Sequence, residues 1–222
     1  MHLRPIQELL ELCAQRGAAR WGLDESRIEV LVNPAPPPQD VEPAPLPAGT
    51  FVFVGRLTEQ KALPVLLEAV ARVEGARLEL VGDGPERARL EELAGELGLD
   101  GRVQFAGALA RDEVLAHLAG ARAAVLSSAW ENLPHAAVEA LSVGTPVVST
   151  AVGGVPEVVH DGENGLLVPP GDVAALASAL GAIARDDALR ARLAAGAQPS
   201  VAAIGRDAIY GRLEEILVEA AR

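Results

Sequence analysis

The chain has 222 residues, half of them apolar and only 3% aromatic, which suits one large domain or two small ones with an aliphatic core. Nineteen basic and 31 acidic side chains give a formal net charge of −12, and no basic stripe offsets it, so we expect no nucleic-acid partner. A single cysteine, Cys13, and four scattered histidines rule out a disulfide framework and offer no metal-ligand spacing.

The start of the chain has the pattern of neither a targeting segment nor a membrane anchor. Glu8 and Glu11 interrupt its apolar stretch, which excludes a signal peptide and a membrane span. A reduced, cytoplasmic protein is therefore the expected setting.

Residues 1–49 differ in pattern from the rest of the chain. Apolar residues at near-helical spacing predict an amphipathic helix over 3–19, and IEVLV predicts a short strand over 28–32. Seven prolines within 34–47 predict an extended linker, because proline suits neither a helix interior nor a central strand. We therefore place a boundary after residue 49 and assign 50–222 to a second unit.

From Thr50 onward, apolar runs alternate with helical patterns. The predicted strands are 51–55, 77–84, 102–107, 123–128, 145–150 and 165–170. The predicted helices are 61–73, 85–98, 111–121, 134–144 and a short one near 156–160, then a helical region from 172 to the end with breaks near 186 and 199. Continuously apolar strands alternating with helices predict a doubly wound parallel α/β sheet of the Rossmann-like type.

Three details of the helix starts follow from the same patterns. Pro85 and Pro134 are expected at the first helical position, where a missing N–H costs nothing. Asp112 is a candidate cap for the helix over 111–121.

Ligands of such sheets bind beyond the carboxyl ends of the strands, so the loops there are the candidate site. Arg56 follows Gly55 directly at the end of a strand, and Lys61 lies near the next helix start. Two cations beside free backbone N–H groups can clamp a diphosphate. Two solvated surface cations are the alternative, and it stays open on this spacing alone.

Two glycine-containing loops lie at the same edge. Gly82 in VGDGP allows a tight turn and the close approach of another backbone, while Asp83 can simply cap that turn. Gly153 and Gly154 allow the chain to pass close to a ligand, although any tight turn would also need them.

The stretch WENLPHAAVEAL carries two carboxylates eight positions apart. Glu131 precedes a predicted helix, and Glu139 lies about a turn and a half inside it. Helical side chains lean toward the N-terminus, so both carboxylates can flank one site and accept hydrogen bonds from vicinal hydroxyls. A solvent-facing Glu139 is the alternative. His135, at the helix start, can donate to an anion or simply be exposed.

Several stretches combine into a family resemblance over about residues 28–195. They read GRLTEQKALPVLLEA, LELVGDGPERARLEELAGELGLDGRVQFAG and SSAWENLPHAAVEALSVGTPVVSTAVGGVPEVVHDGENGLLVPPGDVAALA. In order and spacing, including Glu131 and Glu139, they resemble the C-terminal, donor-binding domain of the group 1 (family 4) retaining glycosyltransferases, which have the GT-B fold.

The resemblance implies transfer of a hexosyl unit from a nucleotide-diphosphate sugar to a hydroxyl acceptor with retention. It implies that Arg56 and Lys61 hold the diphosphate, that Glu131 contacts the transferred sugar and that Glu139 binds the ribose hydroxyls. It also implies that no metal or other cofactor is needed, because the cations and the helix dipole replace a metal. The remaining candidate donor-binding residues are Gly55, Gly82, Asn132, Leu133 and Pro134.

The sequence departs from the family pattern at three places. Ala62 stands where the family often has glycine, Asn132-Leu133-Pro134 stands where it often has Gly-Phe-Gly, and Asn33-Pro34 stands where it often has Asn-Gly. About 50 residues precede the first strand of the donor domain, too few for the N-terminal, acceptor-binding domain of a GT-B enzyme. We therefore expect that domain to be missing or to belong to a separate subunit.

Two other functions stay open from the sequence alone: a non-catalytic nucleotide-sugar-binding or partner-docking module, and a sugar-nucleotide epimerase of the same fold. A membrane-surface acceptor and self-association through the amphipathic first and last helices also stay open.

Overall fold

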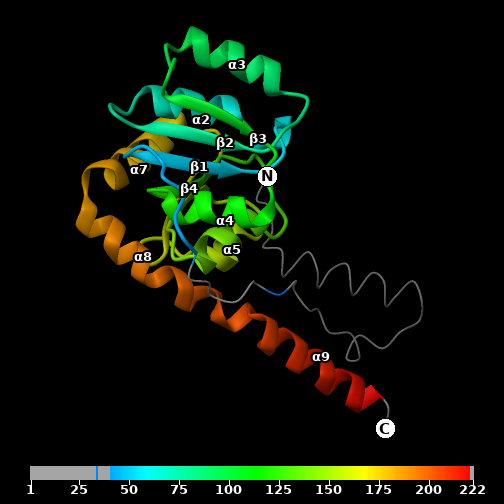
Figure 1. The fold of residues 1–222 in the computed structure, drawn as a ribbon. Coiled ribbons are helices and arrows are strands. Elements are labelled where there is room, and N and C mark those ends of the chain that lie inside the picture. Colours follow the sequence, from blue (N-terminus) through cyan, green and yellow to red (C-terminus); the bar gives the residue numbers. More distant parts are fainter. Residues whose placement is uncertain (1–33, 35–40, 221–222) are drawn as a thin grey trace.

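The computed structural model describes residue 34 and residues 41–220 (Figure 1). The helix and strand expected over 3–19 and 28–32 lie outside these residues. One parallel sheet has the strand order β3-β2-β1-β4-β5-β6, so the predicted doubly wound α/β fold is confirmed. The strands are β1 (Thr50–Val54), β2 (Arg77–Val81), β3 (Val103–Gly107), β4 (Ala123–Leu126), β5 (Val147–Thr150) and β6 (Gly165–Val168).

Helices cover both faces of this sheet (Figure 1). Buried side chains of α2, α3 and α7 form the core on one face, and those of α4, α5 and α6 form the core on the other, with α8 contributing to both. The helical segments are η2 (Glu59–Lys61), α2 (Leu63–Ala71), α3 (Arg87–Glu96), α4 (Arg111–Gly120), α5 (His135–Ser142), α6 (Val155–Val158), α7 (Val173–Arg185), α8 (Asp187–Val201), η3 (Ala202–Ile204) and α9 (Arg206–Ala220).

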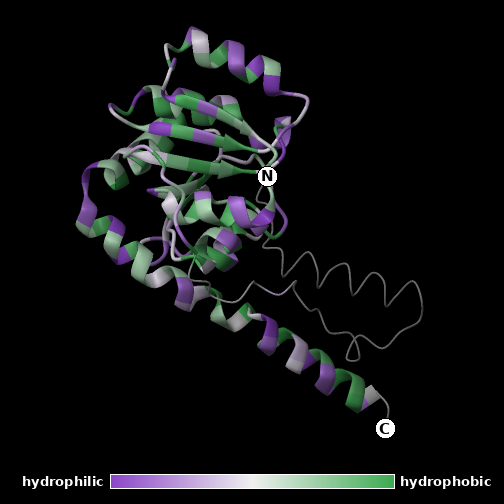
Figure 2. Cartoon of the chain, in the orientation of Figure 1, coloured by the Kyte–Doolittle hydropathy of each residue, from purple (hydrophilic) through white to green (hydrophobic). Residues whose placement is uncertain are grey.

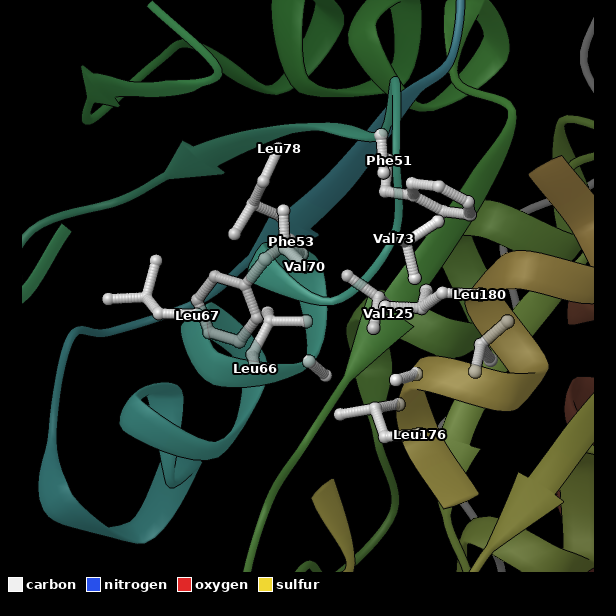
Figure 3. Close-up of a cluster of buried hydrophobic side chains, with 14 of the residues drawn as sticks. Phe51, Phe53, Leu66, Leu67, Val70, Val73, Leu78, Val125, Leu176 and Leu180 are labelled. Carbon is white, nitrogen blue, oxygen red and sulfur yellow. The ribbon is translucent and has the colours of Figure 1, made fainter. Parts of the chain in front are cut away.

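Successive side chains of a central strand enter opposite cores. Phe51 and Phe53 of β1 pack with α2 and α7, as Figure 3 shows, whereas Val52 belongs to the core beneath α4 and α5. All three are at most 1% exposed. Burial on both faces explains the apolar runs of β1 and β4, whereas β2 and β3 carry purple bands among the green in Figure 2.

The described part of the proline-rich segment lies along the α/β domain. Residues 41–47 contain no helix or strand, as their prolines predict. The Ala44 N–H donates to the Ala116 carbonyl at 2.9 Å, and Leu46 packs against the core beneath α4. Residues 41–47 therefore form an irregular segment that packs against the domain. The boundary after residue 49 stays a prediction.

Prolines mark the helix boundaries less closely than the sequence suggests. Pro134 is the N-cap of α5 with ψ of 91°, one residue before the expected position, and Pro85 precedes α3 by two residues. The predicted break near 199 is found two residues later, where α8 ends at Val201, and Pro199 itself lies inside that helix. Pro199 is exposed, so water can reach the carbonyl that its missing N–H leaves without a partner.

The expected cap of α4 is also wrong. Asp112 lies within the first turn, and it is the Glu113 carboxylate that accepts a hydrogen bond from the Ala110 N–H at 2.8 Å. Glutamate at this position has the length to reach back to the N-cap backbone, whereas Asp112 contributes only its charge near the helix start.

The predicted helix over 61–73 is divided at Ala62, which adopts φ 45° and ψ 41° between η2 and α2. Ala62 is the only non-glycine residue with positive φ in the described part of the chain. Left-handed backbone costs an L-residue about 1–2 kcal/mol and costs glycine little. The sequence departs from the family's frequent glycine at this same position.

Ala62→Gly is therefore expected to raise the free energy of unfolding by about 1 kcal/mol, measured by urea denaturation. The matched control is Ala191→Gly, on an exposed position of α8, which should lower it by about 1 kcal/mol. A loss of stability in both variants would contradict the assignment of strain to Ala62.

Candidate functional site

A cleft of about 410 Å³ opens at the carboxyl ends of β1 and β4. These two strands are neighbours at the point where the strand order reverses, which is where doubly wound sheets bind ligands. The cleft brings together seven of the nine residues predicted to form the site, which are Gly55, Arg56, Lys61, Glu131, Leu133, Pro134 and Glu139. Gly82 and Asn132 lie outside its lining.

Lys61 and Glu131 form an ion pair in which the two side chains are 18% and 7% exposed. The buried Ser128 hydroxyl donates to the same carboxylate oxygen, Oε1, at 2.6 Å. Among the described residues no hydrogen bond reaches Oε2, so this oxygen can accept one from a ligand hydroxyl. The sequence placed both charges at the cleft but did not predict that they pair.

Hydrogen bonds join the loop after β1 to the loop after β4. The Gln60 amide donates to the Trp130 carbonyl at 2.9 Å, and the Ala129 N–H donates to the Gln60 carbonyl at 2.8 Å. The Ser127 hydroxyl donates to the Lys61 carbonyl at 2.7 Å. The two walls of the cleft are therefore held as one unit before any ligand binds.

The double glycine supports the Glu131 loop from behind and does not line the cleft. A Cβ on Gly153, whose φ is +53°, would lie 1.8 Å from the Glu131 carbonyl oxygen. The Gly154 N–H donates to the Asn132 carbonyl at 3.1 Å. We expected these glycines to approach a ligand, but in the structure they approach the backbone that carries Glu131.

Gly82 has a similar supporting position. Its φ is +130°, and a Cβ there would lie 2.0 Å from the Gly55 carbonyl oxygen, so only glycine allows the two strand ends to meet. The Asp83 carboxylate accepts a hydrogen bond from the Gly84 N–H at 2.7 Å, which is the turn-capping alternative. Gly82 therefore holds Gly55 in place from outside the cleft.

Two features of the cleft can attract an anion. Arg56 is exposed at its rim, and the start of α5 faces it through His135 and Ala136. Among the described residues no side chain caps α5, and the N–H groups of His135 and Ala136 are open to an anion, whereas the Ala137 N–H donates to the Pro134 carbonyl at 3.0 Å. The cleft thus offers an anion site within a chain of net charge −12.

Glu139 lines the cleft from the second turn of α5, with its side chain 24% exposed. The solvent-facing alternative does not describe it, because Glu139 lines the cleft and most of its side chain is buried. Its Oε1 lies 3.9 Å from the guanidinium of Arg111, in the first turn of α4. Sequence reasoning missed Arg111, although its position after the carboxyl end of β3 was a usable signal.

Other lining residues were also missed, namely Val54, Thr58, Gln60, Leu126 and Ala136. Thr58 and Gln60 belong to the GRLTEQK stretch, where only the two cations stood out. Among the described residues, no group of three His, Cys, Asp or Glu gathers as a metal site would require. Nor does any helix there reach the length and apolarity needed to cross a bilayer.

The cations and the helix start of the cleft can bind an anion, and its two carboxylates can accept hydrogen bonds from hydroxyl groups. The cleft therefore fits a ligand that carries both an anion and hydroxyl-bearing groups. Comparison with known proteins identifies the family of this chain. The profile described as "Glycosyl transferases group 1" matches residues 39–199. The chain belongs to the group 1 glycosyltransferases.

Relatives of this glycosyltransferase chain are similar at both the sequence and the structural level. The lipopolysaccharide core biosynthesis glycosyltransferase LpsE of Rhizobium meliloti (strain 1021) is 43% identical over 174 residues, covering 78% of this chain and 51% of LpsE. Sucrose-phosphate synthase from Thermosynechococcus elongatus superposes with a TM-score of 0.79 at 30% identity, over 94% of this chain and 57% of the synthase.

A structure of Anabaena HepE in complex with UDP-glucose superposes with a TM-score of 0.73 at 29% identity, over 78% of this chain and 49% of HepE. The α/β sheet described above is thus that of GT-B glycosyltransferases, and the chain spans about half the length of the relatives it matches.

Proposed function

We propose that this chain is the donor-binding half of a retaining glycosyltransferase that transfers a hexosyl unit from a nucleotide-diphosphate sugar to a hydroxyl acceptor. The observation that carries the proposal is the single cleft in which Arg56, the Lys61–Glu131 pair, the start of α5 and Glu139 meet. Family membership and the similarity to HepE, whose structure contains UDP-glucose, support it.

The groups of the cleft are assigned to the parts of such a donor by their chemistry. Glu131, whose Oε2 accepts no hydrogen bond from another described residue, accepts hydrogen bonds from the sugar hydroxyls, and Glu139 accepts them from the ribose. Between these carboxylates, Arg56, Lys61 and the first turn of α5 hold the diphosphate.

The same positive groups assist the chemical step. When the bond between the anomeric carbon and the diphosphate breaks, negative charge increases on the departing phosphate oxygen. Preformed cations and helix N–H groups stabilise this charge more than that of the intact donor, which lowers the barrier. Arg56 and Lys61 therefore contribute to catalysis as well as to binding, and this charge complement makes a metal unnecessary.

The proposed reaction also requires a protein surface that binds the acceptor. This chain covers only 51% and 50% of two relatives, so a second domain or subunit is proposed to supply the acceptor-binding groups. A cytoplasmic location of the protein remains part of the proposal, and it is compatible with an acceptor at a membrane surface.

A thermal-shift series tests the donor site directly. We expect one of UDP, GDP or ADP at about 100 times its dissociation constant to stabilise the chain by about 2.7 kcal/mol, which for about 220 residues is a rise of roughly 5–10 °C in Tm. The matching nucleotide sugar should act similarly, and EDTA should change neither result. No stabilisation by any of the three diphosphates would overturn the proposal.

Transfer itself is tested by adding the nucleotide sugar that stabilises best and following nucleoside diphosphate release. Binding without transfer or hydrolysis, even in the presence of a relative's acceptor-binding half, would instead favour a non-catalytic nucleotide-sugar-binding module.

A further inference from the structure

We propose that Ser128 is a positioning residue whose hydroxyl keeps the Glu131 carboxylate oriented toward the donor sugar while Lys61 binds the diphosphate. This inference rests on the proposed function and extends it to a residue behind the cleft. Ser128 is 0% exposed and does not line the cleft, so it acts on the donor only through Glu131.

One oxygen of the Glu131 carboxylate has two donors, which come from opposite walls of the cleft. Lys61 ends η2, after β1, and Ser128 lies in the loop after β4. Both donate to Oε1, the Ser128 hydroxyl at 2.6 Å. Because the two donors from the described part of the chain share Oε1, Oε2 is the oxygen that remains for a hydroxyl of the sugar.

Lys61 has a second role in the proposed reaction, because its ammonium also lines the cleft that is to receive the diphosphate. A diphosphate carries more negative charge than a carboxylate and therefore competes with Glu131 for this ammonium. The Ser128 hydroxyl carries no charge, and a buried hydroxyl is not drawn toward the diphosphate. With the donor bound, Ser128 is thus the group that still holds Oε1 in place.

Ser128 is itself held by the end of the neighbouring strand. Its carbonyl accepts a hydrogen bond at 2.7 Å from the hydroxyl of Thr150, which ends β5 and is 1% exposed. The hydroxyl of Ser128 therefore starts from a fixed backbone and orders the Glu131 side chain before any sugar binds. Without it, the sugar would have to order that side chain itself, which costs about threefold to tenfold in affinity.

The experiment measures dissociation constants by calorimetry for a nucleoside diphosphate and its nucleotide sugar. The probes are UDP with UDP-glucose, GDP with GDP-mannose and ADP with ADP-glucose, and the pair that stabilises the wild-type chain is used. Ser128→Ala should weaken the nucleotide sugar about threefold to tenfold and change the affinity for the diphosphate by less than about twofold. The ratio of the two constants is the readout, because a general loss of folding changes both alike.

Ser127→Ala is the matched control. Ser127 is the preceding residue, it is also 0% exposed, and its hydroxyl donates to the backbone carbonyl of Lys61 at 2.7 Å. Each variant loses one buried hydrogen bond, so both should lower Tm by a similar amount, about 2–5 °C. Only Ser128→Ala should change the ratio of the two constants.

A double-mutant cycle tests whether Ser128 acts through Glu131. Glu131→Ala should itself weaken the nucleotide sugar about tenfold or more, since a charged hydrogen-bond acceptor is lost. In that background Ser128→Ala should change the ratio by less than about twofold, because no carboxylate is left to orient. An undiminished effect of Ser128→Ala in the absence of the Glu131 side chain would overturn the positioning role.

The other outcomes separate this inference from the proposed function. If no nucleoside diphosphate binds the wild-type chain, both fail. If the diphosphate and the nucleotide sugar bind, and Ser128→Ala weakens the two equally or weakens neither, the donor site stands and the hydroxyl of Ser128 contributes only to stability.

Discussion

Replacing Lys61 by methionine should lower the free energy of unfolding by about 3 kcal/mol. The substitution leaves the carboxylate of Glu131, which is 7% exposed, with the Ser128 hydroxyl as its one remaining partner among the described residues. Removing one member of a largely buried ion pair is costly because the other charge stays desolvated. Urea denaturation measures the difference, and a fall of roughly 6–12 °C in Tm should accompany it.

Glu131→Gln in the same chain should restore most of this stability, since it removes the charge that Lys61→Met leaves unpaired. The double variant should nevertheless bind the nucleoside diphosphate weakly, because the diphosphate has lost a cation. Arg89→Met is the matched control: its ion pair with Glu86 is exposed on the arginine side, at 68%, and its loss should cost less than about 0.5 kcal/mol. Equal stability of the Lys61→Met and wild-type chains would contradict the importance of the pair.

Glu139→Ala should weaken binding of the preferred nucleoside diphosphate by about 100-fold, because hydrogen bonds from two ribose hydroxyls to one carboxylate are lost. Calorimetry with the 2′,3′-dideoxy form of the same diphosphate tests this cause. The wild-type chain should bind the dideoxy form about 100-fold less tightly, whereas Glu139→Ala should bind both forms alike.

Glu96→Ala, on an exposed position at the end of α3, is the control and should bind as the wild-type chain does. If Glu139→Ala still prefers the ribose form by the wild-type factor, then another group holds the hydroxyls and Glu139 has a different role.

Local patterns were enough to predict the sheet. The strands are short, mainly apolar runs that end near a glycine or polar loop, and in β1 and β4 burial on both faces of the sheet makes the run continuous. Glu139 was also predictable, because the spacing from Pro134 and the lean of helical side chains follow from helix geometry alone.

Contacts between distant segments were not predictable. The Lys61–Glu131 pair joins residues 70 positions apart, and the contact of Gly153 with Glu131 depends on how two loops cross. Neither contact produces a periodic pattern in the sequence. Ala62 was missed for another reason: alanine favours helix, and only the turn between η2 and α2 forces it into left-handed backbone.

The long separation between the two walls of the cleft has a consequence for synthesis of the chain. The side chains of Gln60 and Lys61 find partners at Trp130 and Glu131, and that loop is in turn supported by Gly153. A chain emerging from the ribosome therefore has no complete cleft until the fifth strand and its following loop have left the exit tunnel. Nascent chains interrupted before that point should form part of the sheet and yet have no donor pocket to fill.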